Sequence, residues 1–267
     1  MAESLTRLMK RAQAHLRYVH TLKRVRVTLG GARVADTTRA VLVWEPRRIV
    51  PEYAVPEADV VAPLLPDPAE PPAGGAALLL DPGVPFAVHT TAGDPLTVSV
   101  GGATGGAFRL ADPDLAGYVV LDFAAFDWLE EDEPLVGHPR DPYNRIDVCP
   151  SSRTIRVSHE GVVLAETSRA MILFEGTLPV ARYYMPKDDV RVRLAPGTLH
   201  TTCAYKGHAT HWTARADGLE LPDVAWSYED PLRDGERVKG MVSFYNEHLD
   251  VTIDGEKVAR PVTPWSR

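Results

Sequence analysis

The sequence predicts a mainly β protein: two homologous, mostly antiparallel domains in tandem, preceded by a short helix. A long internal repeat and hairpin patterns in both copies support this prediction. VRVTLGGARVADTTRAVLVWE (25–45) aligns without gaps on IRVSHEGVVLAETSRAMILFE (155–175), and 13 of 36 positions are identical when the comparison runs from residue 25 to residue 60. A repeat unit of about 130 residues is too long for a solenoid and indicates a duplicated domain.

Each copy opens with a hairpin pattern. Gly30-Gly31 separates two β-type runs in the first copy, and Glu160-Gly161 does so in the second. Tight hairpin turns need positive φ angles, which glycine adopts readily. Asp254-Gly255 predicts a further hairpin near the C-terminus. A single large sandwich is the weaker alternative, because the repeat restarts the same hairpin.

The N-terminal segment MAESLTRLMKRAQAHLRYVH predicts an amphipathic helix with Ser4 as its N-cap. We expect its apolar side to pack on the body of the protein, and binding of a partner is the alternative. Charges throughout the segment argue against an export signal.

Domain boundaries follow from turn-forming residues, which cluster at 137–152. We therefore predict a helix over 1–22, a first β domain over 23–145 and a second over 146–267. PDPAEPPAGG (66–75) is predicted to be a Pro- and Gly-rich loop within the first copy.

Composition limits the classes of function. The net charge of −7 gives no basic field for nucleic acid and disfavours an anionic membrane surface. No run approaches the ~18 apolar residues of a membrane span. Cys149 and Cys203 are too few for a disulfide scaffold or a four-cysteine zinc site, and they suit a reducing cytoplasm. Arg-rich, Lys-poor usage with abundant Ala, Val and Pro favours a bacterial source with a GC-rich genome.

The segment HTTCAYKGHATH (200–211) is the densest in reactive side chains. A metal site there is disfavoured, because the spacing of its three histidines and one cysteine fits no zinc motif and extended chain would spread them. Lys206 follows Cys203 by three residues, and a neighbouring cation raises the thiolate fraction of a cysteine. Cys203 is therefore a candidate nucleophile, with His200 or His208 as the base.

Binding is the alternative function for this segment. Lys206 would hold an anionic or carbonyl-bearing ligand, with Thr202 and Tyr205 as hydrogen-bond partners. A purely structural turn is the third interpretation, since a lone cysteine is usually a small buried apolar residue.

Two further strands offer candidate ligand contacts. Alternation in RAMILFE places Arg169 and Glu175 on one face, where they would line a cavity with polar ends or form a structural ion-pair network. Trp226 and Tyr228 share a face in AWSYEDP and, with Tyr183, would form an aromatic wall. Ordinary core packing is the competing interpretation of these aromatics.

The first copy lacks this chemistry when HTT at 89–91 is aligned with HTT at 200–202, since no Cys, Tyr or Lys follows. We therefore expect the C-terminal copy to be the active one and the N-terminal copy to be a scaffold or lid. The dinucleotide, phosphate-loop and Gly-x-Ser-x-Gly motifs are absent from the sequence.

HPRDPYNRIDVCPSSRTIRV, GVVLAETSRAMILFEGTLPVARYYMPKDDV, TTCAYKG and AWSYEDP together resemble the bacterial and fungal family named Domain of Unknown Function 427. The match covers the second copy nearly end to end, and the first copy resembles a diverged member. The resemblance implies a β-tent (Mss4-like) fold, a group that includes methionine sulfoxide reductase B and the thalidomide-binding domain of cereblon. The four-cysteine zinc of many such domains is ruled out by the two cysteines of this chain.

The family pattern falls on a set of positions in the second copy. They are Arg169, Glu175, Tyr183, Thr202, Cys203, Tyr205, Lys206, Gly207, Trp226 and Tyr228. The usual Cys-Pro is Cys203-Ala204 here, which loosens the expected turn. A nucleotidyltransferase label sometimes given to the family finds no paired metal-binding carboxylates or Gly-Ser signature in this sequence.

Our first hypothesis is a cytoplasmic protein that binds a small molecule on the C-terminal β domain, with no cofactor and no metal. The second is an enzyme in which Cys203 is the nucleophile or redox thiol and Lys206 its activator. The third is a non-catalytic scaffold that pairs with a partner or forms a homodimer.

Overall fold

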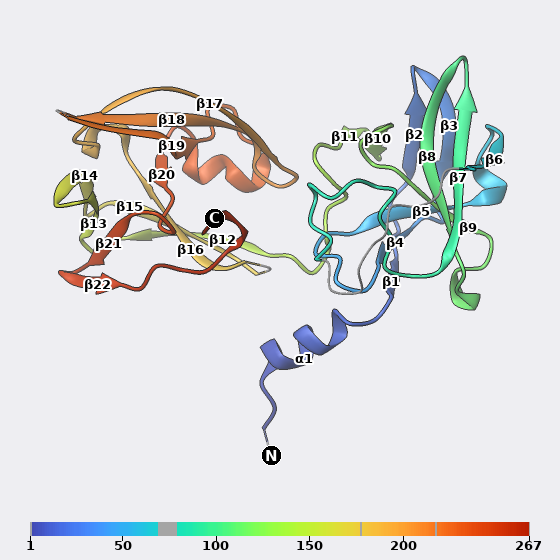
Figure 1. Ribbon diagram of the computed structural model, residues 1–267, viewed down its shortest axis with the longest axis horizontal. Helices are drawn as coiled ribbons and strands as arrows, with labels where there is room; N and C mark the ends of the chain where they lie inside the picture. The colour runs from blue at the N-terminus through green and yellow to red at the C-terminus, as the bar shows by residue number, and fades with distance from the viewer. Residues whose placement is uncertain (1, 69–78, 177, 217, 267) are drawn as a thin grey trace. The chain divides into compact units, whose positions relative to one another are not determined.

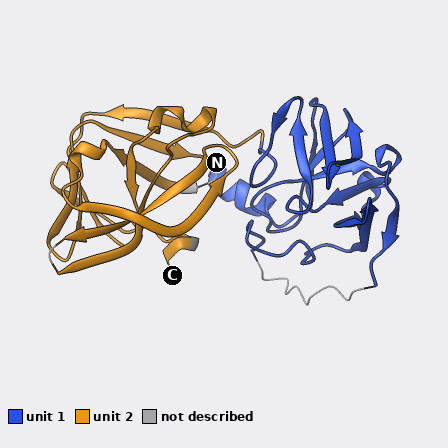
Figure 2. Cartoon of the chain, turned by 90° about the horizontal axis from the view of Figure 1, so that it is seen from above, with its two compact units in different colours: residues 1–141 blue, residues 142–267 orange. Residues whose placement is uncertain are grey.

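The computed structural model describes residues 2–68, 79–176, 178–216 and 218–266. The chain divides into two compact units, Met1–Asp141 (unit 1) and Pro142–Arg267 (unit 2), which are coloured separately in Figure 2. This division lies within the predicted junction at 137–152. Most of the loop predicted at 66–75 lies outside the described residues.

Unit 1 contains one α-helix, eleven strands and two 3-10 turns among its described residues (Figure 1). They are α1 (Leu5–Ala12), β1 (Arg17–His20), β2 (Val25–Leu29), β3 (Ala32–Thr37), β4 (Val41–Trp44), β5 (Glu52–Pro56), η1 (Glu57–Asp59), β6 (Leu64–Pro66), β7 (Gly93–Val100), β8 (Ala103–Leu110), η2 (Pro113–Leu115), β9 (Tyr118–Leu121), β10 (Asp127–Glu130) and β11 (Glu133–Pro134). The strands form a seven-stranded sheet, β1-β4-β5-β9-β8-β7-β6, and a four-stranded sheet, β11-β10-β2-β3.

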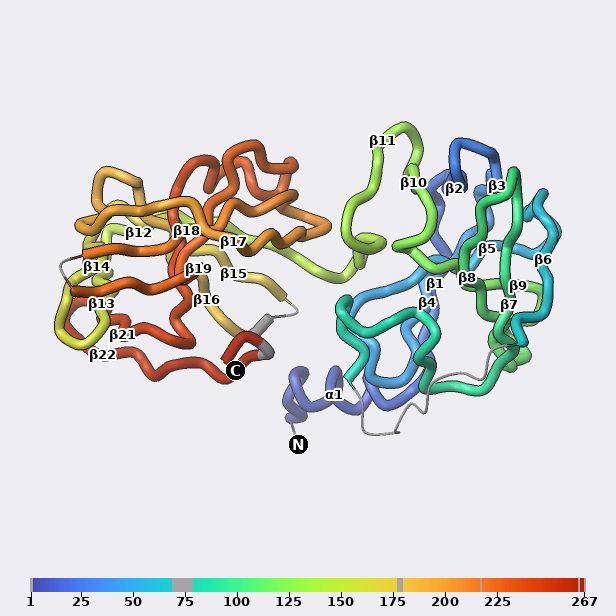
Figure 3. Tube along the Cα trace, turned by 45° about the horizontal axis from the view of Figure 1, so that its top comes forward, coloured from blue at the N-terminus to red at the C-terminus, as the bar shows by residue number. Residues whose placement is uncertain are grey.

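Unit 2 repeats this arrangement. Its elements are β12 (Ile146–Ser151), β13 (Ile155–His159), β14 (Val162–Thr167), β15 (Ala170–Glu175), β16 (Leu178–Met185), η3 (Lys187–Asp189), β17 (Arg193–Cys203), β18 (Gly207–Ala216), β19 (Leu219–Ser227), η4 (Arg233–Val238), β20 (Val242–Phe244), β21 (Asp250–Ile253), β22 (Glu256–Val258) and η5 (Pro264–Ser266). The sheets have the orders β12-β15-β16-β20-β19-β18-β17 and β14-β13-β21-β22 (Figure 3).

The two units share one topology, since corresponding strands occupy the same place in each sheet order. Strand pairs within the four sheets are antiparallel. The prediction of a mainly β chain with two similar antiparallel halves and a short N-terminal helix is therefore confirmed.

The predicted hairpins form where the turn residues stand. Gly30 and Gly31 have φ angles of 57° and 82°, and the turn residues Glu160 and Gly161 have 48° and 84°. Both first hairpins also carry a β-bulge at the same place, after Val27 and after Val157. A bulge shared by the two copies is a retained feature of the fold rather than a local defect.

The main core of each unit lies between its two sheets. In unit 2 it joins Ile155, Val157 and Ile253 of the four-stranded sheet to Ile172 and Phe244 of the seven-stranded sheet. We call the opposite side of each seven-stranded sheet its outer face. Alternation places every second residue of a strand there, so the outer face carries the remaining side chains.

The N-terminal helix differs from expectation in its packing. α1 begins after Ser4 but ends at Ala12, so the predicted helix over 1–22 is too long: Arg17–His20 form β1, which pairs with β4. The Ser4 side chain makes no capping bond, and the helix buries no residue. Leu5, Leu8 and Met9 are 71%, 40% and 56% exposed. The expectation that its apolar side packs on the body is wrong. No helix in the described part of the chain is long and apolar enough to cross a membrane.

Candidate functional site

The outer face of the seven-stranded sheet in unit 2 is a buried apolar surface with polar groups set into it. Its buried apolar members are Val148, Leu173, Tyr184, Ala209, Trp226, Tyr228 and Val238. They come from β12, β15, β16, β18 and β19, together with η4 and the segment that follows β19. Half of the ten candidate residues in the second copy lie on this face or at its edge.

Lys206 is a buried cation of this face. It ends the three-residue turn between β17 and β18, and its residue is only 6% exposed. Its Nζ donates to Oε2 of Glu175 at 2.8 Å, and Nδ2 of Asn144 donates to the other Glu175 oxygen at 3.3 Å. Burial by itself lowers the pKa of Lys206, but the neighbouring Cys203, Glu175 and Tyr184 outweigh it and the pKa is raised. Lys206 is therefore a stably charged group.

The segment after β19 covers this turn. Leu232 donates its backbone N–H to the carbonyl of Lys206 at 3.0 Å, and a Cβ placed on Gly235 would lie 3.3 Å from the Lys206 Cα. Gly207 has φ +92°, and a Cβ on it would meet the Leu232 nitrogen at 3.3 Å. Glycine is needed at 207 both for its left-handed backbone and for this close approach.

Two phenols and an indole lie beside the ion pair. Nε1 of Trp226 donates to the hydroxyl of Tyr184 at 3.1 Å. Burial raises the pKa of Tyr184 to about 12 and holds the pKa of Tyr228 well above its usual value. Both phenols are therefore neutral near pH 7 and available as hydrogen-bond donors.

A second buried ion pair lies on the same face. Arg182 donates to both carboxylate oxygens of Glu247 at 2.7 Å, and it also bonds to Asn246. Its guanidinium lies 5.3 Å from the centre of the Trp226 ring and 5.5 Å from that of Trp265. These cation–π contacts add to the bonds with Glu247 and Asn246 that hold Arg182 in the face.

Cys203 is half-buried at the edge of this surface, opposite Gly207 across the β17–β18 turn. It interacts electrostatically with Lys206 and Tyr228. The structure thus brings together five of the candidate residues: Glu175, Cys203, Lys206, Trp226 and Tyr228. Within the described residues, no three His, Cys, Asp or Glu side chains are grouped so that they could hold a metal ion.

Three other candidates lie elsewhere. Arg169 is exposed and pairs with Asp189 at 2.9 Å rather than with Glu175. Tyr183 packs against the core between the two sheets. Thr202 is exposed, and its hydroxyl contacts Nδ1 of His208 at 2.9 Å. Tyr205 and Gly207 shape the turn, where Tyr205 is buried.

Sequence reasoning missed Arg182 and Tyr184, which share the outer face. The signal was the register of β15 and β16, where Met171 pairs with Tyr184 and Leu173 with Arg182. Cross-strand partners project to the same face, so Tyr183 must point to the opposite one. Without that register, two adjacent tyrosines could not be assigned to faces.

The alignment of the two HTT segments is also wrong. In unit 1 Val120 pairs with Phe108 on one side and Ala54 on the other. In unit 2 Ser243 pairs in the same way with Trp226 and Tyr184. Ala54 and Tyr184 are equivalent in the repeat, so Phe108 and Trp226 are equivalent too. Pro95 pairs with Phe108 as His211 pairs with Trp226. Pro95 and His211 are therefore equivalent. Thr90 stands five residues before Pro95, and Lys206 stands five residues before His211, so Thr90 occupies the position of Lys206.

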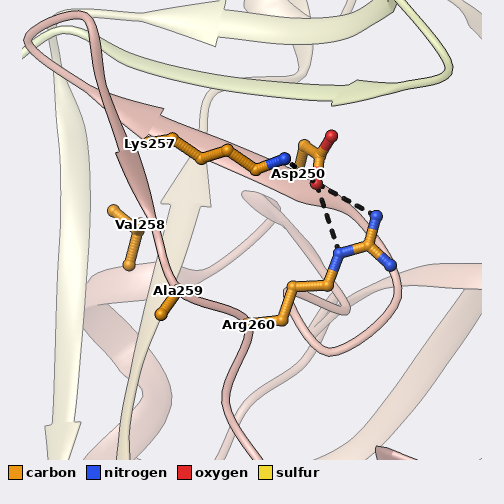
Figure 4. Close-up of a pocket in the computed structure, with 5 residues that line it drawn as sticks. All are labelled: Asp250, Lys257, Val258, Ala259 and Arg260. Carbon is orange, nitrogen blue, oxygen red and sulfur yellow. Dashed lines mark hydrogen bonds and ion pairs between the residues drawn. The ribbon is translucent and has the colours of Figure 1, made fainter.

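A shallow hollow near the C-terminus is lined by Asp250, Lys257, Val258, Ala259 and Arg260 (Figure 4). Lys257 and Arg260 both donate to one Asp250 oxygen at 3.0 Å. The carboxylate thus ties the hairpin strand β22 and the segment after it to β21. This is a surface ion-pair network, and we assign it a structural role.

The chain matches the family described as Domain of unknown function (DUF427) over residues 17–70 and 147–255, which is more than half of its length. The chain belongs to this family. The first matched segment falls within unit 1 and the second within unit 2. No curated protein matches the sequence. The relationship to β-tent folds stays a prediction.

Proposed function

We propose that unit 2 binds a small molecule through its anionic or carbonyl group, on the outer face that carries Lys206. The buried Lys206–Glu175 pair is the observation that supports this. Burying two charges costs desolvation energy that the pair only partly recovers, so such pairs are poor devices for stability. Charged groups buried among aromatic side chains are characteristic of binding and catalytic sites.

The geometry suits an oxygen ligand. An ammonium group has three N–H donors, and the bond to Glu175 uses one of them. A carboxylate or carbonyl oxygen accepts another, while the neutral hydroxyl of Tyr228 donates to the same oxygen or its neighbour. The partly buried Met171, Met241 and Tyr245, which pack against Trp226 and Tyr184, supply apolar surface for the body of the ligand. Free Cys149 and Cys203 fit a reducing compartment, so we propose the cytoplasm as the location.

The test is thermal denaturation of the full chain with a panel of aromatic and aliphatic monocarboxylates. At least one should raise the melting temperature by several degrees, as stabilisation by mass action requires. The shift should vanish in the double variant Lys206→Met/Glu175→Leu, which removes both charges together and so leaves neither one buried alone.

Lys187→Met is the matched control, because Lys187 also pairs with a glutamate, Glu229 at 2.7 Å, but is exposed. This variant should keep the shift. A shift that survives in the double variant, or a panel without any stabilising member, would contradict the proposal.

A thiol-dependent reaction is the second candidate, favoured by the position of Cys203 beside Lys206. Cys203 is partly exposed, so a reagent can reach its thiol. Cys149 is exposed and serves as an internal reference in the same chain. If Cys203 is a nucleophile, iodoacetamide should label it faster than Cys149 at pH 7, and Lys206→Met/Glu175→Leu should abolish the difference. Slower labelling of Cys203 in the folded protein would eliminate this candidate.

A further inference from the structure

The outer face of unit 1 carries two neighbouring carboxyl groups, Glu52 in β5 and Asp122 directly after β9. Ala54 of β5 pairs with Val120 of β9, and continuing this register by two residues brings Glu52 and Asp122 to opposed positions. The charge of Asp122 acts on Glu52 and raises its pKa. Glu52 is buried and Asp122 is half-buried. Like charges at opposed positions destabilise a sheet. When both groups are ionised, the arrangement is therefore unfavourable unless a cation binds between them.

Arg48 partly neutralises the carboxylates on this face. Its guanidinium contacts Glu52 at 3.1 Å and Glu45 at 3.3 Å, and it is only 6% exposed. Its buried Nε has no hydrogen-bond partner in the described residues. Asp122 accepts a backbone N–H from Ala124 at 3.0 Å. A buried polar network that leaves a donor unmatched is costly unless another molecule completes it.

Glu45 is a third carboxylate that shares Arg48, and it has further partners of its own. His89 Nδ1 lies 2.9 Å from one oxygen, and the N–H groups of Thr90 and Thr91 donate to the other at 2.7 and 3.2 Å. These bonds outweigh the effect of burial and lower the pKa of Glu45. Glu45 is therefore an ionised anchor, and the deficit of positive charge falls on Glu52 and Asp122.

An aromatic ring lies next to the carboxylates. Gly106 of β8 lies beside Asp122, whose N–H donates to the Gly106 carbonyl at 3.0 Å. A Cβ on Gly106 would meet the Phe86 ring at 3.0 Å and the Asp122 Cβ at 3.6 Å. The half-buried Phe86 thus packs on bare backbone next to Asp122, where the cluster reaches the surface.

We propose that unit 1 carries a second binding site, for a small organic cation that also bears a hydrogen-bond acceptor, such as an amino alcohol. Glu52 and Asp122 bind the ammonium group, Nε–H of Arg48 donates to the acceptor, and Phe86 packs on the apolar part. The site is separate from the one in unit 2 and opposite in charge preference. Burial and the nearby carboxylates raise the pKa of Glu52 to about 8 in spite of Arg48, and burial raises the pKa of Asp122.

The experiment is calorimetric titration of the full chain at pH 8 with phenylalaninol, and with 3-phenylpropan-1-ol as the neutral relative of the same skeleton. Phenylalaninol should bind at least about tenfold more tightly. Its affinity should rise between pH 6 and pH 8, because Glu52 loses its proton in this range while the amine stays charged. Glu45, Arg48, His89 and Asp122 are the other ionisable groups around Glu52.

Glu52→Gln and Asp122→Asn should each weaken phenylalaninol binding about tenfold or more. Both are close in size to the native residues and remove a repulsive charge, so at least one should fold. The unit 2 variant Lys206→Met/Glu175→Leu is the matched control and should bind normally. The proposal is overturned if the neutral alcohol binds equally well, if phenylalaninol does not bind at millimolar concentration, or if only the unit 2 variant loses binding.

Discussion

In unit 1 the register of β5 and β9, continued by two residues, brings Glu52 and Asp122 together on the outer sheet face, whereas unit 2 has Arg182 and Tyr245 at the equivalent positions. The strand order and hairpin turns around them are alike in the two units. The difference teaches that the core between the sheets maintains the fold, while the outer face is free to change its chemistry.

One outer-face residue is the same in both units but has different partners. Glu45 is bound by His89, Arg48 and two backbone N–H groups, while Glu175 is bound by Lys206 and Asn144. Thr90, at the position of Lys206, contributes only its backbone N–H to Glu45. Both units thus keep the glutamate that accepts these bonds, but the lysine that donates to it in unit 2 is a threonine in unit 1.

Breaking the Lys206–Glu175 pair of unit 2 should have the largest effect on stability. Lys206→Met leaves the Glu175 carboxylate buried without its cation, so we expect a loss of about 3–5 kcal/mol in the free energy of unfolding. The double variant with Glu175→Leu should recover most of it, and Lys187→Met at the exposed pair should cost under about 1 kcal/mol. Urea unfolding measures all three. Equal stability of the single and double variants would contradict the buried-pair assignment.

The unit 1 carboxylates should make stability depend on pH. The pKa of Glu52 is about 8 when folded and near 4.3 when unfolded, so the folded state binds the extra proton between these values. The contribution of Glu52 to the free energy of unfolding is therefore fully present below pH ~4.3. It falls by about 3 kcal/mol as the pH rises toward 8.

Urea unfolding at pH 5 and pH 8 tests this, with Glu52→Gln expected to flatten the decline. Glu57→Gln in the same unit is the control of opposite sign, because the bond from Arg109 lowers the pKa of Glu57. Its removal should reduce stability at pH 8. A decline that persists unchanged in Glu52→Gln would show that another group causes it.

Gly207 has no glycine counterpart in unit 1, where Thr91 stands at the equivalent position. Gly207→Ala should cost about 2 kcal/mol, because alanine is strained at φ +92° and its Cβ presses on Leu232. Gly255→Ala is the matched control, with φ +86° and no atom within 4 Å of its Cβ. Thermal denaturation should show a smaller loss for it; equal losses would mean that the close approach to Leu232 is unimportant.

The smallest effect should come from a feature that the units share. Arg169 pairs with Asp189, and Arg39 pairs with Asp59 in the same geometry; both arginines are 62% exposed. Exposed pairs contribute little, so Arg169→Ala and Arg39→Ala should change the melting temperature slightly and to the same extent. Neither should alter binding of a carboxylate by unit 2. Loss of that binding in Arg169→Ala alone would restore Arg169 as a ligand contact.

Much of the fold was predictable because local signals agree with it. The Gly30-Gly31 and Glu160-Gly161 turns lie between alternating β runs, and the hairpins form there. Candidate residues close together in sequence, such as Cys203 and Lys206, were also brought together. Residues on different strands were less predictable: Arg169 and Tyr183 were assigned to the site, and Arg182 and Tyr184 were missed. A shift of one residue changes the face, and sequence alone does not give strand register.

The sequence by itself determined the duplication, the β class, the turns and the low number of cysteines, because each depends on residues near one another in the chain or on composition alone. Tertiary structure decided which groups meet. Glu175 and Lys206 are 31 positions apart and become partners only through the sheet order of unit 2. Glu52 and Asp122 are opposed only because β5 and β9 are neighbours. Charge pairing depends on distance in space, and here strand pairing sets that distance.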